Sequence, residues 1–343
     1  MAAIKRGLLW GVALLVGVSG LGMLEACSSG DSAAPPPAAG APAGTVYLAD
    51  QDNAGVLELY RVASPGVSTK LNPALPAGRN VNSFLLTPDG TAVIYTADQD
   101  TDNVGELYRV AFANPGVSTK LNPALPAGRG GAFTLVLTPD GTAVIYTADQ
   151  DNAGVLELYR VAFASPGVST KLNPALPAGR NVNSFLLTPD GTAVIYRADQ
   201  GTANVGELYR VAFTNPGVST KLNPALPAGR NVNSFLLTPD GTAVIYRADQ
   251  DTANVLELYR VAFANPGVST KLNPALPAGR NGAFDAVLTP DGTAVIYGAD
   301  QDTEGVIELY QVAFTSPGVS TKLNGPLVAN GRVSGFCVNS QCR

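Results

Sequence analysis

The chain contains no histidine, and tryptophan occurs once, at position 10. Histidine is the side chain most often used as a general base near neutral pH and the commonest metal ligand in proteins. No phosphate-binding loop or dinucleotide fingerprint is present either. These absences predict a protein that is not an enzyme and that holds no metal ion and no cofactor.

Charged residues are also scarce, at 14% of the chain, and the acidic ones are in excess. Residues 1–26 include Lys5, Arg6 and Glu25, so the chain without them carries 20 basic and 26 acidic side chains, a net charge of −6. Nucleic-acid binding requires a basic surface that releases counterions from the phosphates. We therefore expect no nucleic-acid partner.

Long apolar runs are confined to the N-terminus. Lys5 and Arg6 precede "GLLWGVALLVGVSGLGML", a run typical of a signal peptide, although it is long enough to be a retained membrane anchor. The following "LEAC" resembles a bacterial lipobox, which predicts a lipoprotein signal peptide over residues 1–26 and lipidation of Cys27. Acyl chains bind a bilayer through burial of about 0.8 kcal/mol per methylene, so the membrane is an expected partner.

The next segment, residues 27–44, is rich in Pro, Ala and Gly and has no aromatic residue. Such a composition cannot form a core, and we interpret the segment as a tether. Ser28, by resemblance to enterobacterial lipoproteins, indicates sorting to the outer membrane. The expected location is the bacterial cell envelope, on either the periplasmic or the surface side.

Cysteine is rare, with three residues in all. Besides Cys27, only Cys337 and Cys342 are present, close together near the C-terminus. In an oxidising compartment such a pair is most simply a small disulfide.

What the sequence has in abundance is repetition over residues 45–343. "TPDG" begins at Thr87, Thr138, Thr188, Thr238 and Thr289, "ELY" recurs six times every 48 to 51 residues, and residues 167–200 are identical to residues 217–250. Each unit predicts four strands: "VNSFLL", "TAVIY" after a Pro-Asp-Gly turn, "ELYRVAF", and "VSTKLN" after a Pro-Gly turn. Repeated four-stranded units of this length predict an all-β fold, a six-bladed β-propeller of antiparallel blades.

The two ends of the repeat complement each other. The first unit opens at "GTVYLADQD" without a first strand, and the last unit continues past "STKLN" into "GRVSGFCVN", where Phe336 aligns with Phe84. We therefore expect one blade to be shared between the N- and C-terminal strands.

The stretch "TPDGTAVIYTADQDTDNVGELYRV", Thr87–Val110, resembles the repeat of the TolB-like, WD-repeat-like propellers. The resemblance recurs in all six units and implies a propeller of the bacterial envelope whose commonest role is protein–protein binding. The additional N-terminal domain of TolB is absent, so the resemblance does not carry TolB's own partners to this chain.

Antiparallel strands place the "ADQD" and "PALPAGR" loops at the same end of every blade. One Asp and one Arg per unit would therefore form a charged ring, which predicts either a binding face or Asp–Arg pairs that tie the loops together. These residues are Asp50, Asp98, Asp149, Asp199, Asp249, Asp300, Arg79, Arg129, Arg180, Arg230, Arg280 and Arg332.

Differences between the near-identical units gather at the same end. They read either as adaptation to a ligand or as drift. The positions are Thr96, Thr147, Arg197, Arg247 and Gly298 on one strand, and Thr134 and Asp285 near the "GR" loops.

Two further features at this end have alternative readings. Asp98–Asn103 alternates carboxylates as calcium loops do, but it lacks the glycine expected at the sixth position, which favours a solvated loop. The tyrosines of "ELY" have strand spacing and are expected to pack between blades, the alternative being a surface for stacking sugars.

Together these patterns predict a lipid-anchored, non-catalytic scaffold that binds an envelope protein or peptide. The alternative is a module that binds carbohydrate or cell-wall polysaccharide. A hydrolase is less expected, because carboxylates repeated in every unit are better explained by structure than by catalysis.

Overall fold

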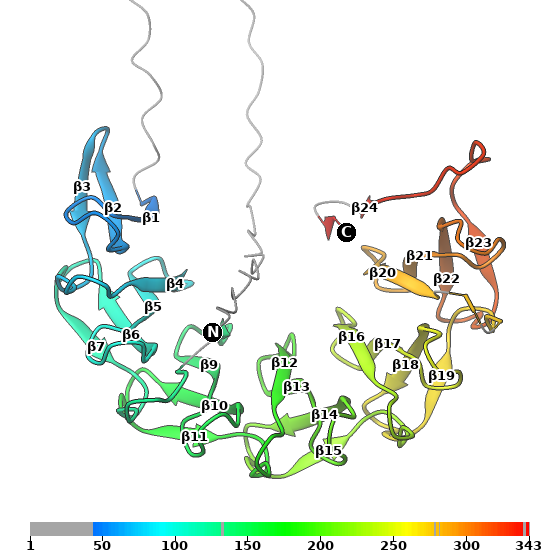
Figure 1. Ribbon diagram of the computed structural model, residues 1–343, viewed down its shortest axis with the longest axis horizontal. Helices are drawn as coiled ribbons and strands as arrows, with labels where there is room; N and C mark the ends of the chain where they lie inside the picture. Colours follow the sequence, from blue (N-terminus) through cyan, green and yellow to red (C-terminus); the bar gives the residue numbers. More distant parts are fainter. Residues whose placement is uncertain (1–43, 132–133, 278, 281, 339–340, 343) are drawn as a thin grey trace, which may run out of the picture. The chain divides into compact units, whose positions relative to one another are not determined.

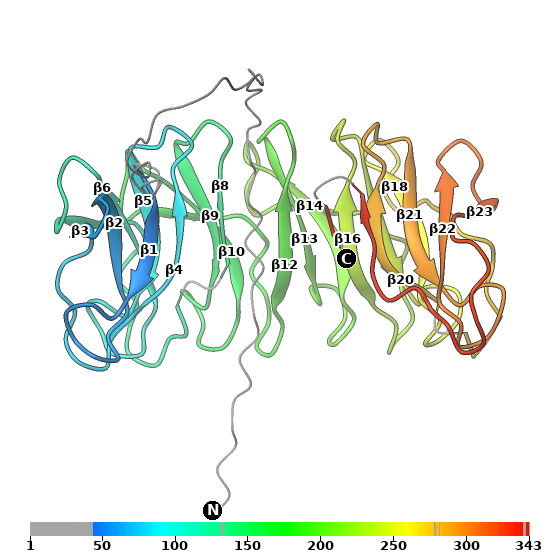
Figure 2. The ribbon, with the colours of Figure 1, turned by 90° about the horizontal axis from the view of Figure 1, so that it is seen from above.

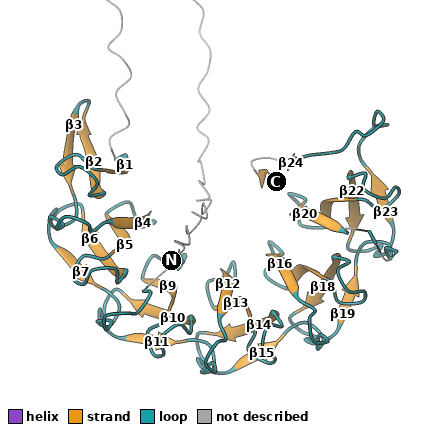
Figure 3. Ribbon diagram, in the orientation of Figure 1, coloured by secondary structure: helices purple, strands orange, loops and turns teal. Residues whose placement is uncertain are grey.

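The computed structural model describes residues 44–131, 134–277, 279–280, 282–338 and 341–342. It is all-β: Figure 3 shows only strands and loops, and no helix in this part of the chain could cross a membrane. The predicted signal peptide, Cys27 and all but the last residue of the tether lie outside the described residues. All the sheets belong to one compact unit.

Six sheets follow one another along the chain and form the blades of a β-propeller (Figure 1). Their strands are β1 (Val46–Ala49), β2 (Glu58–Ser64), β3 (Val67–Lys70); β4 (Val81–Leu86), β5 (Ala92–Ala97), β6 (Glu106–Ala111), β7 (Ser118–Lys120); β8 (Leu135–Leu137), β9 (Ala143–Ala148), β10 (Glu157–Ala162), β11 (Ser169–Lys171); β12 (Val182–Leu187), β13 (Ala193–Ala198), β14 (Glu207–Ala212), β15 (Ser219–Lys221); β16 (Val232–Leu237), β17 (Ala243–Ala248), β18 (Glu257–Ala262), β19 (Ser269–Lys271); β20 (Ala283–Leu288), β21 (Ala294–Ala299), β22 (Glu308–Ala313) and β23 (Ser320–Lys322); a hairpin of β24 (Cys337–Val338) and β25 (Gln341–Cys342) follows.

Each complete blade has the strand order predicted from the repeat. In the second blade the order is β4-β5-β6-β7, every neighbour is antiparallel, and Tyr95 lies opposite Tyr108. Because neighbouring strands alternate in direction, the loops lie at two opposite edges of the array, as Figure 2 shows. One edge carries the "TPDG" and Pro-Gly turns, and the other carries the "ADQD" and "PALPAGR" loops.

The "TPDG" turn has a local cause. The Asp89 carboxylate accepts hydrogen bonds from the Thr87 hydroxyl (2.6 Å) and from the Thr91 backbone N–H (3.1 Å). Gly90 adopts a φ of 66°, which glycine reaches without steric cost. The aspartate is a turn former, as expected, and these hydrogen bonds lower the pKa of its carboxyl to about 2.

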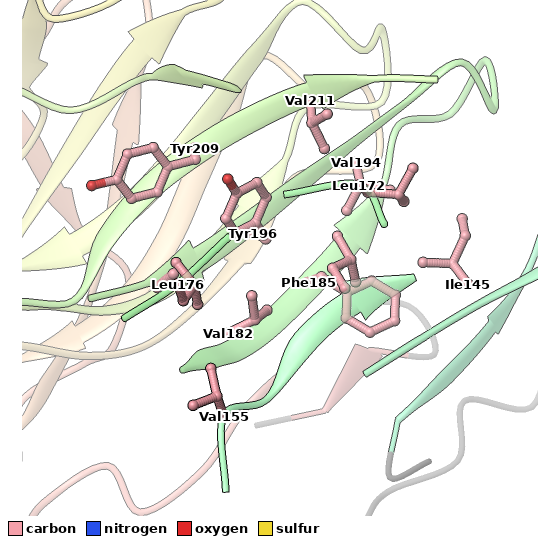
Figure 4. Packing of buried hydrophobic residues seen from close by; sticks show 12 residues of the cluster. Ile145, Val155, Leu172, Leu176, Val182, Phe185, Val194, Tyr196, Tyr209 and Val211 are labelled. Carbon is pink, nitrogen blue, oxygen red and sulfur yellow. The ribbon is translucent and has the colours of Figure 1, made fainter. Parts of the chain in front are cut away.

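The core lies between successive blades. Every residue of β5 is buried, which confirms that "TAVIY" is packed on both faces. Between the third and fourth blades, Ile145 and Leu172 pack in one cluster with Val194, Tyr196 and Tyr209 (Figure 4). The "ELY" tyrosines therefore pack between blades, as predicted, and each stacks on a tyrosine of its neighbouring strand.

Two further contacts repeat at each of the five interfaces between consecutive blades. One is a backbone hydrogen bond, such as Gly217 N–H to Leu172 O at 2.8 Å. The other places an arginine over a phenylalanine of the next blade, with the Arg160 guanidinium carbon 5.3 Å from the Phe213 ring centroid. The equivalent pairs are Arg61–Phe112, Arg109–Phe163, Arg210–Phe263 and Arg260–Phe314.

The two ends of the array depart from the expected strand pairing. Val333 begins like the first strand of a blade, because its N–H donates to Ile307 O at 2.8 Å, as Val81 donates to Leu57 O. Farther on, however, β24 pairs with β25, and β1 pairs with β2 alone, so the first sheet has three strands. Pairing between neighbours in sequence costs less loop-closure entropy than joining the ends of a long chain.

Candidate binding face

The aspartates of the "ADQD" loops organise the backbone. The Asp98 carboxylate is 8% exposed and accepts the Asn80 N–H at 2.6 Å. Asp199 accepts both the Asn181 N–H (2.7 Å) and the Asn204 N–H (3.2 Å). Asp149, Asp249 and Asp300 are buried in the same way, and Asp50 is exposed. These buried carboxylates therefore fix the loop conformation and offer little surface to solvent.

The arginines of the "PALPAGR" loops bind backbone carbonyls. Arg79 Nη1 donates to Gln99 O at 2.8 Å, and Arg180 Nη1 donates to Gln200 O at 2.9 Å. Arg129, Arg230 and Arg280 make equivalent bonds, and Arg332 lines a cleft described below. Among the described residues, no ion pair joins one of these arginines to Asp50, Asp98, Asp149, Asp199 or Asp249. In these blades the two sets of residues hold the loops through hydrogen bonds to the backbone and not as Asp–Arg pairs.

The ion pairs lie elsewhere, in a network that the sequence reasoning missed. Lys120 Nζ lies 2.6 Å from Glu106 Oε2 and 2.6 Å from Asp100 Oδ2, and Glu106 is 1% exposed. Glu106 Oε1 also accepts the Leu125 N–H at 2.9 Å, and Tyr108 donates its hydroxyl proton to Oε2 at 3.2 Å. The recurrence of Glu before Leu-Tyr and of Lys in "STK" was the available signal.

The fourth blade lacks one member of this network. Gly201 stands where the other five blades have aspartate, so Lys221 pairs with Glu207 alone. A Cβ at Gly201 would lie 3.0 Å from Glu207 Oε2 and 3.1 Å from the Tyr209 hydroxyl, so this glycine fills no open space. The exception therefore changes a charge without creating a pocket.

The positions that vary between units are brought together by the strand register. In each of the five four-stranded blades a residue of the first strand lies opposite or beside a variable residue of the second strand, and both face away from the preceding blade. The pairs are Ser83–Thr96, Thr134–Thr147, Ser184–Arg197, Ser234–Arg247 and Asp285–Gly298.

In the second and third blades the variable position of the second strand holds a neutral threonine, Thr96 or Thr147. The Ser83 and Thr96 hydroxyls form a hydrogen bond of 2.8 Å. In the fourth and fifth blades it holds Arg197 and Arg247, both partly buried, and burial lowers the pKa of each guanidinium. The face of the array thus changes from neutral to charged along the chain.

Two clefts lie beside Asp285, and one of them also borders Arg247. One, of about 270 Å³, lies between the fifth and sixth blades and is lined by Arg247, Asp285, Phe235 and Tyr246 among others. The other, of about 230 Å³, lies between the sixth blade and the segment Arg332–Phe336. Asp285 is exposed and lines both clefts.

The sequence allows two alternative sites at this edge, a calcium loop at Asp98–Asn103 and a sugar-stacking surface formed by the "ELY" tyrosines. In the region that the structure describes, no group of three or more Asp, Glu or Cys side chains could hold a metal ion. In the loop Asp98–Asn103, Asp100 pairs with Lys120, and Asp102 accepts from Asn103. The "ELY" tyrosines are at most 4% exposed, so they offer no surface for stacking sugars.

Of the predicted covalent sites, the structure describes the C-terminal cysteine pair but not the lipidation site. Cys27 lies outside the described residues. Cys337 is disulfide-bonded, and Cys342 lies directly opposite it in the terminal hairpin.

Two solved structures of prolyl peptidases support the fold. A prolyl endopeptidase is similar over 78% of this chain, with a TM-score of 0.51 and 14% identity, and prolyl oligopeptidase B of Galerina marginata is similar over 85%, with a TM-score of 0.52 and 12% identity. This chain covers 40% and 43% of those two proteins. TolB of Acinetobacter baumannii is also similar, with a TM-score of 0.39 and 18% identity over 75% of this chain and 57% of TolB.

The comparisons indicate the fold of this chain and not its activity. No protein-family profile matches the chain, and no curated protein matches it. The chain spans about two fifths of the length of the two peptidases, and identities of 12–14% indicate a shared propeller fold only.

Proposed function

We propose that this protein is a non-catalytic interaction scaffold that binds a protein or peptide at the edge carrying the "ADQD" and "PALPAGR" loops. The observation that carries the proposal is the location of the variable residues. The interfaces between blades are nearly identical, whereas Arg197, Arg247 and Asp285 differ from their counterparts and lie at this edge. Exposed loops and clefts on a rigid framework are where binding residues usually occur.

The test is capture of a partner from envelope extracts by crosslinking. A photo-crosslinking residue at position 285 should trap a defined protein, whereas the same residue at position 140, in a "TPDG" turn at the opposite edge, should not. Equal labelling from both positions, or none from either, would count against the proposal. Retention on peptidoglycan or polysaccharide in place of a protein would favour the carbohydrate-binding alternative.

The proposal includes a lipid anchor at Cys27 in the bacterial cell envelope, at the outer membrane. It rests on the apolar run, "LEAC" and the Pro-rich segment that follows. The variant Cys27→Ser should move the protein from the membrane fraction to the soluble fraction and abolish incorporation of radiolabelled palmitate. Cys337→Ser serves as the control and should leave labelling unchanged.

A further inference from the structure

Arg197 and Arg247 have spare donors. Arg197 makes no hydrogen bond or ion pair with any described residue, and its Nε is buried without a partner. Arg247 makes one hydrogen bond, from Nη1 to Ala283 O at 3.3 Å, and its Nε is likewise buried and unpartnered. A desolvated guanidinium that lacks a counter-ion is costly to maintain.

The other arginines with buried Nε atoms differ from these two. Arg109, Arg160 and their equivalents in the "ELYR" strands lie over a phenylalanine ring of the next blade, which compensates part of the desolvation. Neither Arg197 nor Arg247 lies over such a ring. Within the described residues, no cation–π contact compensates the desolvation of these two guanidinium groups.

One aspartate lies near each arginine, but neither aspartate forms an ion pair with it. Asp199 is the charge that acts on Arg197, but its oxygens accept the Asn181 and Asn204 N–H groups. Asp285 acts on Arg247 across the cleft without forming an ion pair with it. Among the described residues, no carboxylate therefore forms an ion pair with either arginine.

We propose that Arg197 and Arg247 bind two carboxylates of an acidic peptide segment, with Asp285 accepting a basic residue that follows them. Arg197 and Arg247 occupy equivalent positions on β13 and β17, and Asp285 lies on β20 of the following blade, beside the equivalent position Gly298. The three residues therefore present a positive, positive, negative series along one edge. A planar carboxylate matches the fork of guanidinium donors. This assignment rests on the proposed function, because it names the chemistry of that same edge.

The chain supplies its own control substitution. The second and third blades have threonine at the same position, at Thr96 and Thr147, with both side chains buried and the fold intact. The variants Arg197→Thr and Arg247→Thr therefore reproduce a pair that the repeat already tolerates. The reciprocal variant Thr147→Arg tests whether the position alone creates an anion site.

The experiment measures binding of acetylated, amidated peptides in which two glutamates and a lysine are separated by Gly-Ser spacers of different lengths. At least one peptide should bind the parent protein, and each Arg→Thr change should weaken it by about tenfold or more, as expected for loss of a charged hydrogen-bonded pair. Replacing both glutamates by glutamine should have the same effect. No binding by any spacer length, or binding that is unchanged in the double variant, overturns the assignment.

Thermal unfolding without peptide is the second readout. The double variant Arg197→Thr/Arg247→Thr should unfold at a higher temperature than the parent, because it removes two unpaired, partly buried charges. A lower temperature would show that the arginines stabilise the fold, and would overturn the assignment. A crosslinked partner that binds both proteins equally would refute the assignment and leave the proposed function standing. Peptide binding without any envelope partner would do the reverse.

Discussion

At the scale of single residues, most of the polar side chains that recur in every unit serve the backbone. Asp89 closes a turn, Asp98 holds a loop, and Glu106 joins a lysine, a tyrosine and a backbone N–H. Recurrence in every blade is what a folding requirement predicts, because each blade must solve the same local problem. The residues that break the recurrence are the ones on which the proposed binding function rests.

Acid should destabilise the protein through the "TPDG" turns. The pKa of Asp89 falls to about 2, and hydrogen bonds also lower the pKa values of Asp140, Asp190, Asp240 and Asp291. A carboxyl whose pKa is depressed by folding stabilises the native state above its unfolded pKa of about 4, and this contribution is lost as the pH falls toward the folded value. Urea unfolding at a series of pH values should therefore show a stability that declines between about pH 4 and pH 2.

The variant Asp89→Asn is the control for this dependence. It should reduce the steepness of the decline, because one of the titrating groups is gone. A stability that is flat over this interval in the parent protein would contradict the assignment of the decline to the turns.

The buried glutamate should matter more than the exposed aspartate of the same network. In the third blade Glu157 is fully buried, whereas Asp151 is 43% exposed. Glu157→Gln weakens charged hydrogen bonds to Lys171 and to the backbone and should lower the free energy of unfolding by about 2 kcal/mol. Asp151→Asn removes an exposed pair and should cost about 1 kcal/mol or less. Chemical denaturation of the two variants measures the difference, and equal losses would contradict it.

At the scale of elements, the interface between blades is the structural unit. Ile145, Leu158 and Leu172 of one blade fill the space beside the tyrosines of the next. A strand buried on both faces follows from this arrangement, since each interior blade has a neighbour on either side. The last blade shows the consequence of lacking one: Leu323 is 43% exposed, whereas its counterpart Leu172 is 1% exposed.

Leu172 and Leu323 form a matched pair for mutation. Leu172→Ala leaves a cavity in a packed interface and should lower the free energy of unfolding by about 2–5 kcal/mol. Leu323→Ala at the equivalent position should cost less than about 1 kcal/mol, because that side chain is already largely in water. Denaturant titration of both variants tests the difference, which would be absent if the sixth blade were covered in solution.

The sequence predicts the elements well and the connections between charges poorly. Strand order, turn positions and the buried "TAVIY" strand follow from spacing, Pro and Gly, which act locally. The role of Glu106 is not visible locally, since Lys120 lies on the next strand across the Pro-Gly turn and Leu125 lies in the loop beyond that strand. The pairing of Ser234 with Arg247 likewise depends on register, and the state of the two terminal strands depends on the balance between local and distant pairing.

At the scale of the whole molecule, the blades are interchangeable. Residues 167–200 and 217–250 are identical, and each begins at a glycine whose N–H bonds to the preceding blade. Deletion of residues 168–217 joins Gly167 to Val218 and recreates the original junction in sequence. Stability in such arrays is close to a sum over repeats and their interfaces.

The deletion variant should therefore fold cooperatively with a β-sheet circular dichroism spectrum. Its denaturant m-value should fall by roughly one sixth, because m scales with the surface exposed on unfolding. Deletion of residues 143–192, which also removes 50 positions, is a less conservative comparison because it places Arg197 beside Thr134 in the position of Thr147. An aggregated or unfolded product from the first deletion would show that the number of blades is fixed by contacts beyond nearest neighbours.

The repeated arginine-on-phenylalanine contact has one more consequence. The last unit has Gln311 where the others have arginine, and the first unit has Ala63 and Ser64 before its Pro-Gly turn, with no phenylalanine between. The last unit thus lacks the arginine of this contact, and the first unit lacks the phenylalanine. Neither end of the array can therefore form the arginine-on-phenylalanine contact with a further blade. A second molecule placed end to end with this one would therefore lack the contact at the junction, whereas an inserted or deleted interior unit would keep it.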